Sequence, residues 1–273
     1  MEIQIIADNY VDSTGLLAEH GFSCLISAKG KTILFDTGQG DGFINNIRRM
    51  NITYADCIAL SHGHYDHTGG LSKHLAECAS ISGDIYASKF IFENHLKLDN
   101  GKTEYDFIGF GGTRGDIERR FRLHLNKEIT EIYPDIFLSG VIERSVDFDA
   151  DGKLFAEVDG VTAKDRFRDE QFLVVRENEG IHIVTGCSHC GPENLIDFAK
   201  KLFPDKKILS LTGGLHLFRS DGSYTQKVID VLRKEDIKTI ATGHCTGIDA
   251  SFAIKAALGE NVLFTKAGMK IVY

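Results

Sequence analysis

Apolar runs of strand length recur along this chain, and most are followed by Gly, Asp or His and then by a helical pattern. Such alternation of short β runs and helices predicts a layered α/β fold. The expected strands cover residues 3–7, 24–27, 31–35, 57–60, 181–185, 207–211 and 237–242. The expected helices cover residues 42–50, 70–77, 194–202, 224–234 and 250–258.

The whole chain, residues 1–273, is predicted to form one domain in which two β-rich halves meet near residue 140. Only three prolines occur, and no repeat or low-complexity linker divides the sequence. The less regular segment at about 84–126 is interpreted as an insertion or excursion over one face. Residues 135–175 alternate apolar and polar side chains, which predicts a hairpin with the Asp-Gly of residues 149–152 as its turn.

Composition excludes several classes of protein. The net charge of −8, from 39 acidic and 31 basic residues, is opposite to that of a duplex-nucleic-acid binder, so we expect no nucleic-acid partner. No apolar run approaches the roughly 18 residues that span a bilayer, so no membrane partner is expected. The first ten residues lack a basic side chain and do not resemble a secretory signal. Six cysteines in a long chain whose first residues do not resemble a signal favour reduced thiols and a cytoplasmic location.

The densest concentration of chemistry is the segment Ser61-His-Gly-His-Tyr-Asp-His-Thr-Gly-Gly70. His62 and His64 are two residues apart in an expected loop, so both rings can converge on one cation. Asp66 and His67 are spaced to reach a second point nearby. Such nitrogen and oxygen donors suit Zn, Mn or Fe(II). A histidine-rich surface loop is the alternative, but the apolar strand before it and the Gly-Gly and helix after it favour a metal site.

Five expected strands end just before residues of ligand type: Asp36, His62, His189, His216 and His244. Side chains in open α/β sheets gather outside the carboxyl ends of strands, where loops bring them together. Six of the eleven histidines lie in these loops. The other five do not, and most of these are expected to be surface or packing residues: His20, His74, His95, His124 and His182.

The HxHxDH motif, the Asp-Thr-Gly of residues 36–38 and the single histidines after later strands resemble the metallo-β-lactamase superfamily over the whole chain. The resemblance implies an αββα four-layer sandwich with one or two Zn²⁺ ions at one edge, Mn²⁺, Fe²⁺ or Mg²⁺ being alternatives. It also implies that one group of residues holds the first ion, a second group holds the second, and Asp36 orients the histidine loop. The group for the first ion is His62, His64 and His189. The group for the second ion is Asp66, His67 and His244.

The sequence departs from the superfamily pattern in two places, both after the HxHxDH motif. A histidine in a Pro-Gly-His setting is missing, and residues 166–171 stand nearest its place. A bridging aspartate is also missing, with Gly186-Cys-Ser-His189 in its position, so His189 substitutes for one or the other. Cys187 is then either a metal ligand or a small buried residue.

Residues 19–23, 186–189, 213–217 and 242–247 resemble a branch of the superfamily typified by a synthase. That enzyme joins a dihydropterin methyl diphosphate to a ribofuranosylaminobenzene phosphate and displaces diphosphate. The alternatives are a metal-dependent hydrolase of a phosphoester, lactone or thioester, and a non-catalytic metal-binding protein. In the hydrolytic case Asp66 would also hold the proton of the nucleophile and His216 would assist the leaving group. A third-metal or structural role for His216 is the alternative.

A small phosphorylated substrate needs local positive charge, because the chain as a whole is acidic. Arg114, together with Arg168 or Arg166, is a predicted phosphate partner, and the alternative for each is an exposed, solvated arginine. Glu19 and His20 lie between the first two expected strands and are predicted pocket residues. The sequence carries no signal for an oligomeric state.

Overall fold

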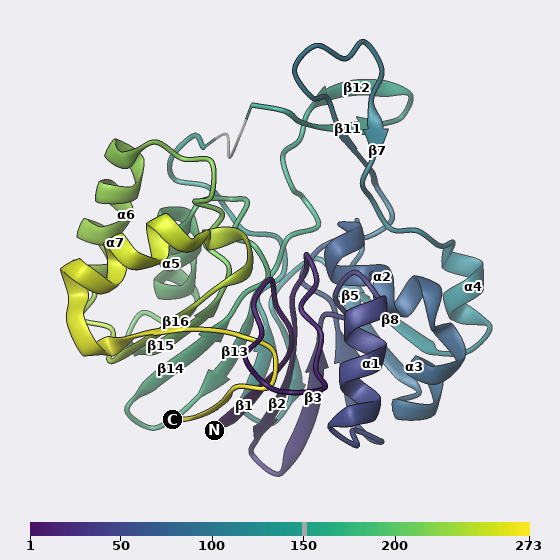
Figure 1. Cartoon of the computed structure of the whole chain (residues 1–273), viewed down its shortest axis with the longest axis horizontal. Helices are drawn as coiled ribbons and strands as arrows, with labels where there is room; N and C mark the ends of the chain where they lie inside the picture. The colour runs from purple at the N-terminus through teal and green to yellow at the C-terminus, as the bar shows by residue number, and fades with distance from the viewer. Residues whose placement is uncertain (149–151) are drawn as a thin grey trace.

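A computed structural model of the protein describes residues 1–148 and 152–273. Two seven-stranded sheets pack against each other, and helices cover both outer faces (Figure 1). The predicted αββα sandwich is confirmed.

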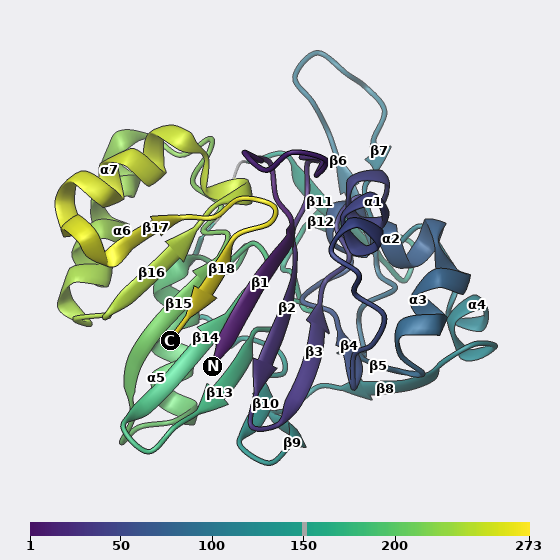
Figure 2. The ribbon, with the colours of Figure 1, turned by 60° about the horizontal axis from the view of Figure 1, so that its bottom comes forward.

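The first sheet is built mainly from the N-terminal half and has the order β18-β1-β2-β3-β4-β5-β8. Strand β18, from the C-terminal end of the chain, pairs antiparallel with β1, so the two termini lie side by side (Figures 1 and 2). Strands β3, β4, β5 and β8 run parallel. The strands are β1 (Glu2–Ala7), β2 (Ser23–Ala28), β3 (Lys31–Phe35), β4 (Cys57–Ala59), β5 (Asp84–Ser88), β8 (Arg122–Asn126) and β18 (Lys270–Val272).

The second sheet comes from residues 130–264 and has the order β17-β16-β15-β14-β13-β10-β9. Strands β14 to β17 run parallel and the others antiparallel. The strands are β9 (Thr130–Tyr133), β10 (Ile136–Leu138), β13 (Leu173–Arg176), β14 (Gly180–Val184), β15 (Lys207–Gly213), β16 (Thr239–Thr242) and β17 (Val262–Phe264).

Helices α1–α4 lie on the outer side of the first sheet and α5–α7 on the outer side of the second (Figure 1). The helices are α1 (Asp41–Arg49), α2 (Tyr65–Lys73), α3 (Leu75–Ile81), α4 (Arg114–Glu118), α5 (Pro192–Leu202), α6 (Gly222–Lys234) and α7 (Ile248–Leu258), with 3₁₀ turns η1 (His244–Thr246) and η2 (Gly259–Asn261). No helix among the described residues combines the length and apolarity needed to cross a bilayer. All six cysteines are free and buried.

The helix expected at residues 70–77 is two helices in the structure. Helix α2 begins earlier, at Tyr65, and His74 (φ −121°, ψ 46°) separates it from α3. Gly69 and Gly70 let the loop that follows β3 lie against α2, since a Cβ on either would come within 2.2 Å of a backbone oxygen of that loop. The early start places Asp66 and His67 in the first turn of α2 rather than in a loop.

A third, four-stranded sheet of order β12-β11-β6-β7 stands above one edge of the sandwich (Figure 1). Its strands are β6 (Asn94–Lys97), β7 (Asp106–Phe107), β11 (Leu154–Val158) and β12 (Val161–Lys164). Segment 84–126 therefore starts and ends in the first sheet and supplies β6 and β7 to the third. The turn expected at 149–152 falls mostly on residues 149–151, outside the described residues. The hairpin β11–β12 instead turns at Asp159 and Gly160, whose φ angles of 52° and 77° suit a type I′ turn.

Three hydrophobic clusters account for the four layers. In β3, Ile33 and Phe35 face the space between the two sheets, whereas Leu34 faces α1 and α2. In β13, Leu173 and Val175 face the same inter-sheet space. This period-2 alternation buries both faces of each central strand.

The carboxyl ends of β3, β4, β14, β15 and β16 lie at one edge of the sandwich, since these strands are parallel within each sheet and the loops after them are in mutual contact. The third sheet stands over this edge (Figure 1). The loops that carry the predicted ligands therefore meet in one place.

Candidate metal centre

Three imidazoles from two loops converge at this edge. His62 and His64 follow β4, and His189 follows β14; one ring nitrogen from each lies within 4.8 Å of the others. All three side chains are buried. The Nε2 atoms of His62 and His64 and both ring nitrogens of His189 have no hydrogen-bond partner. The structure thus brings together the residues predicted to hold a first cation.

Asp36, directly after β3, sets the orientation of two of the histidines. Its Oδ2 accepts hydrogen bonds from Ser61 Oγ (2.6 Å) and from His67 Nδ1 (2.7 Å). Because the hydroxyl proton of Ser61 goes to Asp36, the His62 Nδ1–H donates to Ser61 Oγ (2.9 Å). Both imidazoles therefore turn Nε2 toward the centre. Gly186 is required beside this network, since a Cβ there would lie 2.2 Å from Ser61 Oγ.

A second group surrounds Asp66. Its Oδ2 lies 3.4 Å from His244 Nε2 and 3.9 Å from His67 Nε2, and the two Nε2 atoms are 3.2 Å apart. His244 Nδ1 donates to Asn9 Oδ1 (2.9 Å), which turns Nε2 inward. His20, half-exposed, places Nε2 3.3 Å from Asp66 Oδ2. The predicted second-site residues are therefore also adjacent, with His20 beside them.

The backbone is strained where these loops turn. Asp36, Phe167, Ser188, His216 and His244 have φ angles of 57°, 45°, 60°, 49° and 45°. Residues other than Gly adopt this region at a cost, and such positions cluster at functional sites.

The donors suit a cation of the zinc type. Burial lowers the pKa of His64 to about 4 and holds those of His62 and His189 well below the ordinary value, so the rings are neutral. Burial would raise the pKa of Asp66, but His67 and His244 hold it well below its usual range, so the carboxyl is ionised. Burial would lower the pKa of His244, but Cys245 and Asp66 raise it to about 9, so this ring must lose a proton before it can hold a cation. The three neutral imidazoles, the carboxylate and the unpartnered buried nitrogens are donors of the kind that such a cation requires. The residues therefore fit the metal that the resemblance implies.

Residues 165–171 include the segment 166–171 that stands nearest the place of the expected histidine, and they brace the two loops that carry the predicted ligands of the first cation. Asp169 Oδ2 accepts from the Gly63 N–H (2.6 Å), and Glu170 accepts from the His189 and Cys190 N–H groups (2.6 and 2.7 Å). Gln171 Nε2 donates to Leu60 O (2.9 Å). The ring of Phe167 stacks on His189 with centroids 4.2 Å apart.

His95 on β6, expected to be a surface or packing residue, is buried against residues 165–171. Its Nδ1–H donates to Asp165 Oδ2 (2.6 Å) and its Nε2–H to Asp169 Oδ2 (3.0 Å). Burial opposes the charged form, but the two carboxylates raise the pKa of His95 well above its ordinary value. The sequence signal that could have found these residues is the acidic Asp-Glu-Gln just before an apolar strand. For Asn9, the signal is its position after the first strand.

A cavity of about 450 Å³ opens onto the centre. Its floor contains His64, Asp66, His189 and His216. Its walls combine cationic and aromatic side chains from the third sheet, from the start of α2 and from the loop after β15: Tyr65, Lys97, Phe107, Phe218 and Arg219. These last residues were not predicted, because no local pattern says which loops overhang the edge.

The structure places the other predicted site residues as follows. His20 and His216 line the cavity, and both ring nitrogens of His216 lack a hydrogen-bond partner. Glu19 is not among the lining residues; its carboxylate accepts from four backbone N–H groups (2.8–3.1 Å) at the start of α1.

The predicted phosphate-binding arginines also lie elsewhere. Arg114 Nε donates to Glu118 Oε1 (2.7 Å) on α4, Arg166 pairs with Asp147, and Arg168 pairs with Glu93. None of the three is among the residues that line the cavity in the described part of the chain. This placement does not support their predicted contact with substrate.

Comparison with known proteins identifies relatives over nearly the whole chain. Residues 18–76 match the family model of the metallo-beta-lactamase superfamily. An uncharacterized protein of Methanocaldococcus jannaschii is 33% identical, with 91% of each chain covered. The 7,8-dihydropterin-6-methyl-4-(beta-D-ribofuranosyl)-aminobenzene-5′-phosphate synthase of the same organism is 32% identical, with 92% of this chain and 89% of the synthase covered.

A solved structure is also similar. The crystal structure of Tm1679, described as a metal-dependent hydrolase of the beta-lactamase superfamily, superposes with a TM-score of 0.86. The two chains are 30% identical, and the match covers 100% of this chain and 99% of Tm1679.

Proposed function

Because this chain belongs to the metallo-β-lactamase superfamily, we propose that it is a metal-dependent enzyme that displaces diphosphate from a small aromatic substrate. The proposed reaction is that of the dihydropterin synthase to which it is 32% identical. Zn²⁺ is the proposed cation, since the donors are imidazoles and carboxylate.

One observation carries the proposal: the cavity above the centre joins cationic and aromatic side chains. Lys97 and Arg219 line it beside Asp106 and can pair with phosphate groups; Lys97 also pairs with Asp99 (3.1 Å), so a phosphate would compete with that carboxylate. Three aromatic rings of the lining, those of Tyr65, Phe107 and Phe218, are 37%, 53% and 44% exposed. Exposed aromatic rings at the mouth of a cavity favour a ligand with a flat ring.

The residues of the chain have separable roles in this proposal. Lys97 and Arg219 bind the anionic part of the substrate, and the aromatic rings hold its planar part. A bound divalent cation supplies Lewis-acid stabilisation of negative charge on the leaving group. His216 has two unpartnered ring nitrogens at the floor and can give or take a proton at a substrate oxygen. His20 Nε2, 3.3 Å from Asp66 Oδ2, orients that carboxylate.

A hydrolase of a phosphoester, lactone or thioester is the second candidate. It is favoured by the similarity to Tm1679, described as a metal-dependent hydrolase. The same centre would serve, with Asp66 holding the proton of the attacking water.

The deciding experiment measures diphosphate release from a dihydropterin methyl diphosphate in the presence of ribofuranosylaminobenzene 5′-phosphate. A parallel screen uses phosphodiesters, lactones and thioesters. Turnover in the first assay supports the synthase reaction, and turnover confined to the screen favours the hydrolase. If metal-loaded protein turns over neither set, both proposed reactions fail, and the result favours the non-catalytic metal-binding protein.

Two variants show whether activity belongs to this site. His64→Ala should lose bound metal and activity together. Lys97→Gln should raise KM for the phosphorylated substrate and leave the metal content unchanged. Lys97 lines the cavity, but the potential metal ligands are His, Cys and Asp side chains. Arg114→Gln is the matched control, because this arginine pairs with Glu118 on the outer helix α4. Equal KM values for Lys97→Gln and wild type would remove the proposed anion contact.

A further inference from the structure

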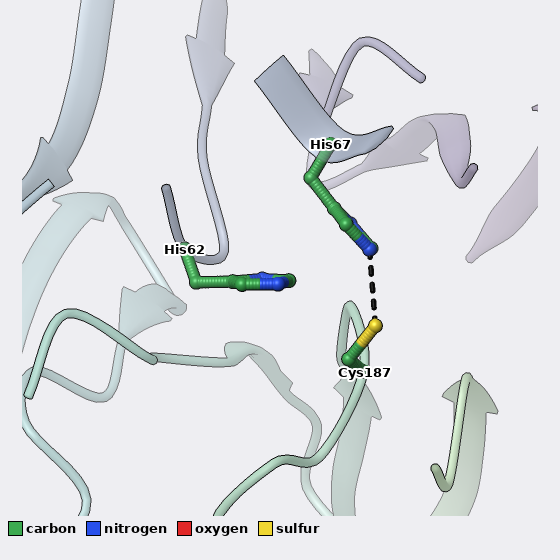
Figure 3. A group of neighbouring side chains, drawn as sticks. All are labelled: His62, His67 and Cys187. Carbon is green, nitrogen blue, oxygen red and sulfur yellow. Dashed lines mark hydrogen bonds between the residues drawn. The ribbon is translucent and has the colours of Figure 1, made fainter. Parts of the chain in front are cut away.

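Cys187 occupies the middle of the histidine cluster. Its Sγ lies 3.0 Å from His67 Nε2 and 3.3 Å from His244 Nε2. Figure 3 shows the His67 ring and the Cys187 thiol pointing at each other, with the His62 ring directed to the same space. Potential ligand atoms of His62, His67 and Cys187 lie within 4.8 Å of one another, as do those of Cys187, His189 and His216. The sulfur is thus shared by residues of both predicted metal positions.

Packing accounts for four of the other five cysteines, whereas Cys245, like Cys187, is buried outside the hydrophobic clusters found among the described residues. Cys190, Cys78, Cys24 and Cys57 each belong to one of the three hydrophobic clusters. Cys187 is equally buried but is a member of none of the clusters found among the described residues. Its neighbours are imidazoles, which a buried thiol does not need for apolar packing.

The backbone on both sides of Cys187 is held rigidly. The Gly214 N–H donates to Gly186 O (2.9 Å), and Ser188 Oγ donates to Gly214 O (2.8 Å). Ser188 itself has φ 60°, and the carboxylate of Glu170 holds the next two N–H groups. The position of the sulfur is therefore imposed by the loop, as is usual for a preorganised ligand.

We propose that Cys187 is a ligand of the metal centre and that its thiolate joins the two cation positions, where the sequence lacks an aspartate. This inference rests on the proposed metal dependence. On binding, the S–H bond breaks, the proton leaves to solvent and a sulfur–metal bond forms, with no change in oxidation state. A thiolate donor selects softer cations such as Zn²⁺ over Mg²⁺, which prefers oxygen ligands.

The test uses Co²⁺ as the probe, because a thiolate ligand gives Co²⁺ a sulfur-to-metal charge-transfer band in the near ultraviolet. Metal-free protein is loaded with Co²⁺, and bound metal and the absorption spectrum are measured together. Wild type should show the band. Cys187→Ser should lose it and still bind Co²⁺ through His62, His64 and His189.

Two further variants control for other thiols. Cys190→Ser removes a buried thiol only three residues away that packs in a hydrophobic cluster, and it should keep the band. Cys245→Ser removes the other thiol near the centre, since Cys187, His244 and Cys245 also form a potential ligand group. Loss of the band in Cys245→Ser with retention in Cys187→Ser would assign the ligand to Cys245 and overturn the proposal.

The remaining outcomes separate this inference from the proposed function. If wild type binds Co²⁺ without the band, Cys187 is not a ligand, while the metal centre stands. If wild type binds no Co²⁺ or Zn²⁺, both the centre and this inference fail. If Cys187→Ser does not fold, Cys187→Asp supplies an oxygen donor of similar reach and should bind Co²⁺ without the band; a band in that variant would overturn the assignment.

Discussion

Glu170→Gln tests whether a buried carboxylate outside the ligand set controls the metal centre. In the wild type, Glu170 accepts two short hydrogen bonds from the backbone N–H groups of His189 and Cys190. Burial raises its pKa, and these two bonds work against that rise. Glutamine has almost the same volume, but its NH₂ group must face one of the two backbone donors. One bond to a charged acceptor is then lost and a buried donor remains unpaired.

The expected loss of stability follows from one lost hydrogen bond and one unpaired buried donor. A hydrogen bond to a charged group contributes about 1.5–3 kcal/mol, so we expect the free energy of unfolding to fall by about 3 kcal/mol once the unpaired donor is included. For a chain of this size that corresponds to a drop of about 6–12 °C in Tm. Because both N–H groups lie in the loop that carries His189, we also expect zinc affinity to fall by roughly 10–100-fold.

The assay has two parts. Urea unfolding of chelated protein measures stability without the contribution of bound metal, and competition with a chromogenic chelator measures zinc affinity. Glu177→Gln is the matched control, because Glu177 is on the surface and pairs with Lys29, where an ion pair contributes about 0–1 kcal/mol. If Glu170→Gln binds zinc as tightly as Glu177→Gln does, the bracing role assigned to residues 165–171 is refuted.

Three further results are expected. Asp36→Asn should weaken zinc binding by roughly 10–100-fold in the chelator competition, because His67 loses the acceptor that orients it; unchanged affinity would contradict this reading. Glu19→Ala should lower the free energy of unfolding by about 1–3 kcal/mol in urea, because the first N–H groups of α1 lose their acceptor, with KM unchanged; a raised KM at wild-type stability would restore its predicted place in the pocket. Burial lowers the pKa of His182 to about 4, so between about pH 6.5 and pH 4 the unfolded chain binds a proton that the folded chain does not, and stability should fall as pH is lowered through this range. Urea midpoints of wild type and His182→Gln across that range measure the effect, and equal slopes would show that His182 does not cause it.

The ligand loops could be predicted because their signals are local. His62, His64 and His67 lie within six residues and follow an apolar strand, and single histidines follow three later strands. Since parallel strands end at the same edge, position after a strand is enough to bring such side chains together. The alternation of short strands and helices predicted a layered α/β fold, and the family resemblance implied the αββα sandwich, whose alternating apolar residues fill three clusters.

The substrate side of the site could not be predicted, because it depends on which segments overhang the edge. Lys97 and Phe107 reach the cavity only because β6 pairs with β11, and β7 with β6, in a separate small sheet. The pairing of β6 with β11 joins residues about 60 apart, and no local pattern encodes it. Arg114 was chosen for its position after a glycine turn, yet it lies on the outer helix α4, paired with Glu118.

The bracing residues explain how one centre is assembled from both halves of the sandwich. Asp169 holds the backbone at Gly63, in the loop after β4 of the first sheet, while the adjacent Glu170 holds His189, in the loop after β14 of the second. Two neighbouring carboxylates thus tie together ligand loops that are more than 100 residues apart. Because the His62 and His189 rings are neutral and do not attract each other in the metal-free chain, we infer that the backbone hydrogen bonds to Asp169 and Glu170 set the distance between them before a cation arrives. The segment that lacks the expected histidine therefore supports the loop that carries His189, the residue predicted to replace either that histidine or the missing aspartate.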